Sequence, residues 1–505
     1  MNIHNTGWWG LITILITVWS CSNHKDTSDI HERIPPDIPL VQVADRTITV
    51  SEFIKRAEYT IRPPHCRGNL NIHKYIVLNS LIAEKLLAIE LEDASVDTHF
   101  MKYLIGRKEQ KMRDVLFYEK AYKLVSIDTV TTLSTADAAV RTYDIRYTTF
   151  RDPTQAQQIY ELLINDSTFE DINQSILHLD RIPTRKVKYL DETDPYICTA
   201  LFGSPLDKDQ IVGPVRTSDG NYLIMQVDGW VSQISLSPEE RSSFINRVSE
   251  KLKTDHAMIR YNEYVSGIMS GKEMKLKEDP FREFVEVVRD HYLASQADKE
   301  EMVQLTLWQE EKKSERADEP PSISYNRNLP LLELDGKTWN LKDIEQLVES
   351  HPLVFRKKRI KPHEFSEQLK FTLADLFRDF YLTQEAYQLG YDLYPTVLQE
   401  VAMWTDSYNA NFVRDQILSD AGIGVMDSNG TLKAIETYLN PHIAELQQMY
   451  SDQILINLEQ FNAIQLTSVD MLAITENAPY PVIVPDFPLL TTLHELNYGK
   501  AMDLK

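Results

Sequence analysis

The sequence predicts a multidomain α+β protein that is mostly helical. The chain has 505 residues, which is too long for one hydrophobic core and suits about three or four domains. Long stretches place apolar residues at helical spacing, as in residues 75–89, 238–269 and 365–389. Short β-prone runs bounded by turn residues lie between them, as at 143–150 and 222–227.

The composition is that of a globular protein and argues against nucleic acid as the main partner. Hydrophobic residues make up 43% of the chain and charged residues 25%, which are ordinary values for a folded protein. The formal net charge is −22 and the isoelectric point is near 5.1, whereas phosphate binding needs a basic face.

Three cysteines are too few for a disulfide scaffold in a chain of this length. Cys66 and Cys198 could pair in an oxidising compartment or remain as two buried thiols. The chain has no Gly-rich phosphate loop, no His-x-x-x-His or Cys-x-x-Cys pair and no G-x-S-x-G motif. The sequence therefore predicts no cofactor and no metal.

The start of the chain predicts an export signal. Residues 8–20 form an apolar run, shorter than the ~20 residues of a membrane-spanning helix but typical of a signal peptide. The run ends in Val18-Trp19-Ser20-Cys21, which resembles a bacterial lipobox and implies a lipid on Cys21. This resemblance implies a lipid anchor in the bacterial cell envelope, on the periplasmic face of the outer membrane. An uncleaved anchor or a simple secretory signal is the alternative.

The first folded part is predicted to be helical after a short hairpin. Apolar residues alternate in this hairpin, and Ser51 is expected to cap the helix that follows it. Helical runs at 75–89 and 98–123 come next. The small, polar residues 128–135 are predicted to be a linker.

The middle of the chain predicts a small α/β module. A strand at 143–150 precedes apolar residues at helical spacing, and a short amphipathic segment ends in Ala200-Leu201-Phe202. The runs 211–215 and 222–227 then flank Asp219-Gly220, which is a strong signal for a hairpin.

This order of segments resembles the second half of a parvulin-type peptidyl-prolyl isomerase domain. The hairpin and helices before it resemble the N-terminal chaperone domain of SurA-like periplasmic foldases. The resemblance implies a four-stranded, helix-flanked unit that binds proline. In parvulins, aromatic and Met side chains form the proline pocket, and histidines on the first and last strands flank a Cys or Asp.

The resemblance assigns a pocket of four aromatic residues. Phe202 matches the pocket phenylalanine of the family, and Tyr222 stands where the last-strand histidine belongs. Tyr147 and Tyr196 are expected to complete a pocket for a proline or an aromatic side chain. The alternative is that these four residues are the ordinary core of a small sheet domain.

No catalytic residue is assigned in this module. Its one histidine, His178, is expected to be a surface residue at a helix end, and Cys198 falls in a predicted helix and not on a strand. Prolyl isomerisation has a barrier of ~18–20 kcal/mol and needs groups that favour the twisted amide. Isomerase activity is therefore expected to be weak or lost.

The second half of the chain is predicted to repeat the opening layout. Residues 331–344 match 41–53 in type, with Asp335-Gly336 as the turn and Asn340 or Thr338 as the helix cap. The alternative is that a hairpin followed by a helix is a common layout.

The last part is predicted to contain a helix, two strands at 454–458 and 461–466, and a strap at 478–488. Proline recurs in this strap and excludes a helix or an inner strand, so the strap is expected to lie extended on the surface. A charged run at 310–321 predicts an exposed linker.

The predicted segments are a signal peptide (1–20), a tether (21–36), a SurA-like helical domain (37–135) and a parvulin-like domain (136–235). A helical connector with a charged linker (236–325), a second SurA-N-like helical segment (326–430), and a C-terminal helix with strands and strap (431–505) follow.

Two functions are compatible with these patterns. The first is a membrane-anchored foldase that binds unfolded or proline-containing polypeptide clients. The second is a non-catalytic structural lipoprotein that uses the parvulin fold as a docking module in an envelope complex.

Overall fold

A computed structural model describes residues 38–67, 71–91, 98–165, 167–178, 180–232, 237–286, 288–289, 292, 327–357, 359–424, 428–467, 473–475 and 478–502. The proposed lipidation site Cys21 and the charged run 310–321 lie outside these residues. The fold mixes helices with small sheets, which confirms the predicted α+β class. In these ranges no helix combines the length and apolar character needed to cross a membrane.

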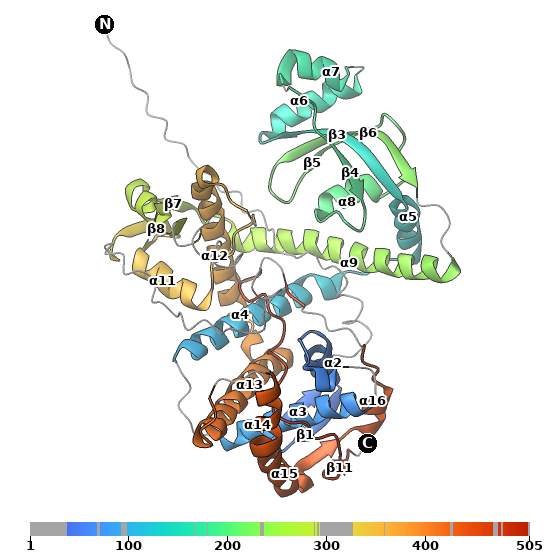
Figure 1. The fold of residues 1–505 in the computed structure, drawn as a ribbon. Helices are drawn as coiled ribbons and strands as arrows, with labels where there is room; N and C mark the ends of the chain where they lie inside the picture. Colours follow the sequence, from blue (N-terminus) through green and yellow to red (C-terminus); the bar gives the residue numbers. More distant parts are fainter. Residues whose placement is uncertain are drawn as a thin grey trace. The chain divides into compact units, whose positions relative to one another are not determined.

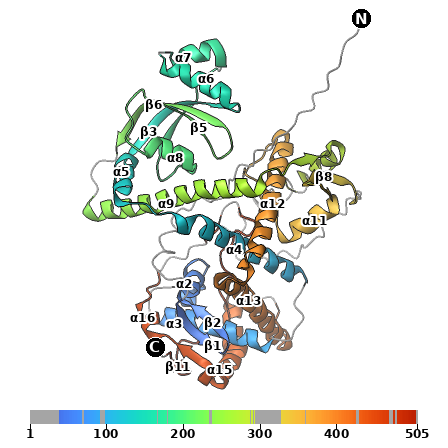
Figure 2. The same cartoon turned by 180° about the vertical axis from the view of Figure 1, so that it is seen from behind.

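The chain divides into two compact units (Figures 1 and 2). The central unit comprises Leu116–Glu385. Among the described residues, the terminal unit joins those from 38 to 115 to those from 386 onward.

The terminal unit brings both ends of the chain into one sheet, in the order β11-β10-β1-β2. β1 is antiparallel to β2 and β10, and β10 is parallel to β11. The bounds are Pro39–Val43 for β1, Arg46–Thr49 for β2, Ile454–Ile456 for β10 and Lys500–Ala501 for β11. Val41 lies between Ile48 and Ile456, and all three are buried. The C-terminal segment thus supplies a strand to the N-terminal hairpin.

Most helices of the terminal unit form one core with this sheet; α3 contributes the largest share of it, and the described residues of α4 and α14 contribute none to it. Buried residues occur on every side of α3, which explains why its sequence is apolar beyond a single stripe. The helices are α2 (Val50–Glu58), α3 (Asn71–Glu90), α4 (Thr98–Lys120), α13 (Pro395–Asp420), α14 (Ser428–Ala434), α15 (Asn440–Met449) and α16 (Leu458–Ala463).

Two local predictions for the terminal unit are wrong. Thr49, and not Ser51, caps α2 through its side chain. Residues 461–466 do not form a second strand. Asn457 caps the short helix α16 instead, and this helix buries Phe461 in the core.

The strap at 478–488 contains no helix, as predicted, but it bends at 478–480 and 484 and does not merely lie on the surface. Tyr480, Val484 and Phe487 are buried, while Pro481 is exposed. The strap therefore packs some of its residues into the unit and exposes others.

The central unit contains the predicted α/β module as a four-stranded antiparallel sheet. Its order is β4-β3-β6-β5. The bounds are Arg141–Phe150 for β3, Thr184–Lys188 for β4, Ile211–Arg216 for β5 and Tyr222–Ser232 for β6. The predicted strands 143–150 and 222–227 are neighbours in this sheet, with Phe150 opposite Tyr222.

Helices cover both faces of this sheet (Figures 1 and 2). α6 (Pro153–Ile164) and α7 (Phe169–Ile172) pack on one face. α5 (Thr129–Ala139), α8 (Pro195–Phe202) and α9 (Pro238–Met269) pack on the other. The predicted linker 128–135 is wrong, because Asp128 accepts the backbone N–H of Thr131 and begins α5.

The last part of the central unit contains a third sheet, β7-β8-β9, followed by helices. This sheet repeats the layout of the N-terminal hairpin. Buried and exposed residues follow the same order in β8 and β1. The pairing of β1 with β2 and that of β8 with β9 both shift register after the first residue, which is a proline. Asn340 caps the following helix, as predicted. The bounds are β7 (Met274–Leu276), β8 (Pro330–Leu334), β9 (Lys337–Asn340), α11 (Leu341–Ser350) and α12 (Phe365–Gln388).

Cys66 and Cys198 are both buried, and no disulfide joins them. Cys66 belongs to the core of the terminal unit and Cys198 to the core of the α/β module. Of the two interpretations, two buried thiols is the one observed.

Candidate functional site

Phe202, the predicted pocket residue, lies in the core of the α/β module. It ends α8, whose N-cap Asp194 accepts backbone N–H groups of the first turn. The Phe202 side chain has no exposure. Its ring centroid lies 5.3 Å from that of Tyr143 and 5.2 Å from that of Tyr189. These contacts make Phe202 a core residue in this structure and leave no open pocket at its ring.

Tyr222 and Tyr147 are half-buried on opposite faces of the sheet. Side chains alternate along β6, so Leu223 and Met225 pack with Phe202 while Tyr222 packs with the cluster beneath α6. Tyr147 lies on β3 opposite Met225 and packs on the same face as Phe202. The structure therefore brings Tyr147 and Phe202 to one cluster and places Tyr222 in another.

Tyr196, the fourth predicted pocket residue, is half-buried in the first turn of α8. Its hydroxyl accepts a hydrogen bond of 3.4 Å from Nδ2 of Asn262 on α9. Oδ1 of Asn262 is buried without a partner among the described residues. Tyr196 thus takes part in the contact of α8 with α9.

A small polar cluster, which the sequence did not predict, lies between α8 and α9. Nζ of Lys251 is 2.9 Å and 3.0 Å from the two carboxylate oxygens of Asp255, four residues further along α9. The same Nζ lies 5.3 Å from the centroid of the Tyr189 ring. The thiol of Cys198 donates to the carbonyl of Glu192 with a sulfur–oxygen distance of 3.6 Å.

This polar cluster has the chemistry of a structural contact. Burial, and after it the negative charge of Asp255, raises the pKa of Cys198 well above its usual range. The thiol is therefore protonated at neutral pH and is a poor nucleophile. Burial and Asp255 also raise the pKa of Tyr189, which keeps its hydroxyl neutral.

The imidazoles of the parvulin family have no counterpart at the expected positions. Ile145 and Tyr147 occupy the first-strand positions, and Tyr222 occupies the last-strand position. His178 lies exposed at the end of a π-helical turn (Asn173–Leu177), as expected.

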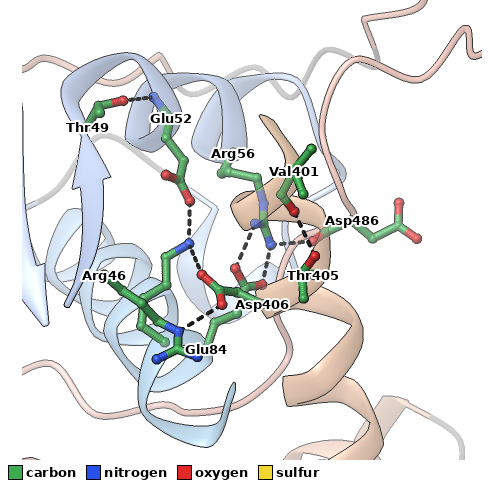
Figure 3. A network of polar contacts seen from close by, with 10 residues as sticks. Arg46, Thr49, Glu52, Arg56, Glu84, Val401, Thr405, Asp406 and Asp486 are labelled. Atoms are coloured by element: carbon green, nitrogen blue, oxygen red, sulfur yellow. Dashed lines mark hydrogen bonds and ion pairs between the residues drawn. The ribbon is translucent and has the colours of Figure 1, made fainter. Parts of the chain in front are cut away.

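The terminal unit buries an ion pair that links α2 to α3 (Figure 3). Arg56 donates two hydrogen bonds to the carboxylate of Glu84, with distances of 2.9 Å and 2.6 Å. The same guanidinium donates to the backbone carbonyl of Asp486, at 2.9 Å. Arg56 thus joins two helices to the strap.

A second group of charges lies beside this ion pair (Figure 3). Nζ of Lys85 is 3.0 Å from a carboxylate oxygen of Glu52 and 3.0 Å from one of Asp406. Nε of Arg46 is 2.9 Å from Asp406. Together with the Arg56 pair, three cations face three anions, so the charges balance without a ligand.

An aromatic and cationic cluster forms where α4 faces α13 in the terminal unit. The guanidinium carbon of Arg107 lies 3.9 Å from the ring centroid of Trp404. Arg107 also donates to Oε1 of Glu400 at 2.7 Å, and Nε1 of Trp404 donates to the same oxygen at 2.9 Å. Sequence reasoning missed this cluster, because its residues come from helices at opposite ends of the chain and form no local motif.

A surface groove of about 310 Å³ lies on the central unit between residues 124–127 and α9. It includes none of the predicted pocket residues. Its lining residues are Leu124, Val125, Ser126, Ile127, His256, Ile259, Arg260 and Glu263.

In comparisons with known proteins, no family model and no curated protein matches the chain. Among the residues that the structure describes, no group of three His, Cys, Asp or Glu side chains could hold a metal ion.

Proposed function

We propose that this chain is a lipid-anchored foldase of the SurA and parvulin type that binds unfolded or proline-containing polypeptide segments. The observation that carries the proposal is the order of elements in the α/β module. The strand β3 is followed by the helices α6 and α7, the strand β4, the helix α8 and the hairpin of β5 and β6. The four strands form an antiparallel sheet in the order β4-β3-β6-β5. The resemblance implied such a four-stranded, helix-flanked unit.

The proposal includes weak or absent isomerase activity. Phe202 is buried under two rings, and no imidazole stands at the positions of the family's histidines. A closed pocket gives a proline ring no place to bind, so the module has no means to favour a twisted amide. Client binding would then be the activity of the chain.

The location proposed is the periplasmic face of the outer membrane, with Cys21 as the lipid anchor. This rests on the apolar run and the lipobox-like segment of the sequence. Fractionation of cells carrying the unmodified chain and a Cys21→Ala variant tests it. The anchored protein sediments with membranes and the variant is released; membrane association of both would contradict the anchor.

Two assays test the foldase directly. The full chain is added to a denatured β-barrel protein as it is diluted from urea, and light scattering measures aggregation. Separately, the chain is added to a substrate whose refolding is limited by proline isomerisation. We expect suppressed scattering and little or no acceleration of refolding. A chain without effect in either assay is not a foldase.

The closed pocket also favours a second function, in which the α/β module is a docking module of an envelope complex. Phe202, Tyr143 and Tyr189 then simply hold the module rigid. A pull-down that recovers one stoichiometric partner, in place of many unfolded proteins, would support this alternative.

A further inference from the structure

The terminal unit holds its own strap by contacts to the strap's backbone. Arg107 donates to the carbonyls of Val482 at 2.8 Å and Ile483 at 3.4 Å. Oε1 of Gln110 accepts the N–H of Tyr480 at 3.1 Å. Further along, Arg56 donates to the carbonyl of Asp486. Helices α2 and α4 therefore contact the strap at both ends through polar side chains.

Apolar side chains of the strap are also accommodated. The ring of Tyr480 meets that of Tyr103 edge to face, with centroids 5.0 Å apart. Val484 is 1% exposed and packs with Tyr59 and Met403. We call the receiving residues the strap surface; they are Arg56, Tyr59, Tyr103, Arg107, Gln110, Met403 and Trp404.

The donors of the strap surface are held in place by residues outside the strap. Glu400 and the Trp404 ring fix the guanidinium of Arg107, and Glu84 fixes that of Arg56. Because the partners of both guanidinium groups lie outside the strap, we expect the surface to stay organised when the strap leaves it. Preorganisation of this kind lowers the entropic cost of binding.

The backbone contacts of the strap surface accept an extended chain and tolerate proline in it. Of the four backbone contacts that side chains of the strap surface make, three go to carbonyl groups, which proline retains, and one to an N–H, which proline lacks. Proline-rich segments are extended, have no internal hydrogen bonds and bind surfaces lined with aromatic residues. The strap itself has prolines at 479, 481, 485 and 488.

We propose that the strap surface is a binding site for extended, proline-containing segments of a client polypeptide, and that the chain's own strap occupies it in the absence of a client. This inference rests on the proposed foldase function and names its client site. A tethered strap competes at a high effective concentration, so the apparent dissociation constant for a client equals the intrinsic one divided by the fraction of chains whose strap has left the surface.

Fluorescence anisotropy of a labelled peptide, with the sequence of residues 478–488, tests this on the full chain. Tyr480→Ala removes the contact with Tyr103 and weakens the strap, so we expect the peptide to bind at least tenfold more tightly than to the unmodified chain. Adding Arg107→Lys to this variant should abolish the gain in affinity, because lysine lacks the planar guanidinium that donates to two carbonyls. Tyr438→Ala, at an exposed tyrosine of the same unit that is outside the strap surface, should leave the affinity unchanged.

Equal affinity of the peptide for the Tyr480→Ala variant and the unmodified chain overturns the inference. Hydrogen exchange of the unmodified chain provides a test without any substitution. Millimolar peptide should speed the exchange of the Tyr480 amide, which Gln110 otherwise protects; unchanged exchange also overturns the inference. If the chain suppresses client aggregation but fails these tests, the foldase proposal stands and only the assignment of the client site to the strap surface is wrong. If it passes them without suppressing aggregation, the foldase proposal is wrong.

Discussion

Arg56 and Glu84 form an ion pair that is almost fully removed from water, with side chains 0% and 1% exposed. Burying two charges costs several kcal/mol, which two short hydrogen bonds offset only while both partners are present. The pair therefore holds α2 on α3 specifically, and the loss of one partner leaves a buried charge behind.

We predict that Arg56→Met lowers the free energy of unfolding by about 3–5 kcal/mol. The double variant Arg56→Met, Glu84→Leu should lose less of its free energy of unfolding, since no unpaired charge remains. Urea unfolding followed by circular dichroism measures both. A double variant less stable than the single one would contradict this account of the ion pair.

Lys55 on α2 gives the terminal unit a pH dependence. Burial, and after it the positive charge of Lys111, lowers the pKa of Lys55 from 10.5 to about 8. Between pH 8 and 10.5 the unfolded chain therefore binds more protons than the folded one, and stability contributed by this residue rises with pH. Below pH 8 the folded state bears the cost of holding this charge in a partly buried position.

Lys55→Met should stabilise the protein by about 1–3 kcal/mol at pH 7, because it removes this cost. The gain should disappear as the pH approaches 10.5, where the lysine is neutral in the folded state. Urea titrations of both proteins at pH 7 and pH 10.5 measure the difference. A gain that is the same at both pH values would exclude Lys55 as its source.

At the residue scale, the sequence identified the aromatic residues of the module but not their partners. Phe202 and Tyr147 were expected in one pocket with Tyr222, and the alternation of β6 places Tyr222 on the opposite face. Burial of Phe202 depends on Tyr189, which follows β4, and on residues of α9. Contacts between segments so far apart have no local sequence signal.

At the element scale, Asp194 connects α8 to the turn between β5 and β6. One carboxylate oxygen accepts the N–H of Tyr196 at 2.9 Å, and the other accepts the N–H of Ser218 at 2.7 Å. Burial raises the pKa of Asp194, against the effect of these hydrogen bonds. One side chain therefore caps a helix and fixes a hairpin turn.

Asp194→Ala should lower the stability of the protein by about 2–3 kcal/mol, because it leaves buried N–H groups without an acceptor. Asp152→Ala is the matched control: Asp152 caps α6 but is exposed and accepts one N–H, so its loss should cost about 1 kcal/mol or less. Thermal unfolding compares the two variants. Equal losses would mean that the link to Ser218 contributes nothing.

Long elements with a regular pattern were predicted well. α9 and α12 match their expected ranges because each repeats apolar residues over many turns. The short helices α5 and α16 were missed. Threonines weaken the helix propensity of α5, and the packing of Phe461 decides the conformation of α16.

At the scale of the whole molecule, the terminal unit depends on pairing between the two ends of the chain. β1 lies between β2 and β10, and Val43 is opposite Ile454. Pattern analysis predicts each strand by itself but cannot predict a partner about 400 residues away, so this sheet could not be deduced from the sequence.

A chain that ends at residue 453 should therefore lose protection throughout α3, because β10, α16 and the strap that cover this core are gone. Hydrogen exchange with mass spectrometry measures the protection of residues 71–90. The sheet of the α/β module, which has its own core, should keep its protection and serves as internal control. Unchanged protection of α3 would show that the C-terminal strand is dispensable.

Both functions considered require a folded module, but only one requires binding of unfolded chains. The direct test is light scattering of a denatured β-barrel protein diluted into increasing amounts of the full chain. The foldase account predicts that scattering falls as the molar ratio approaches one chain per client, and that an excess of the peptide 478–488 restores it. Scattering that stays the same at every ratio would contradict the account.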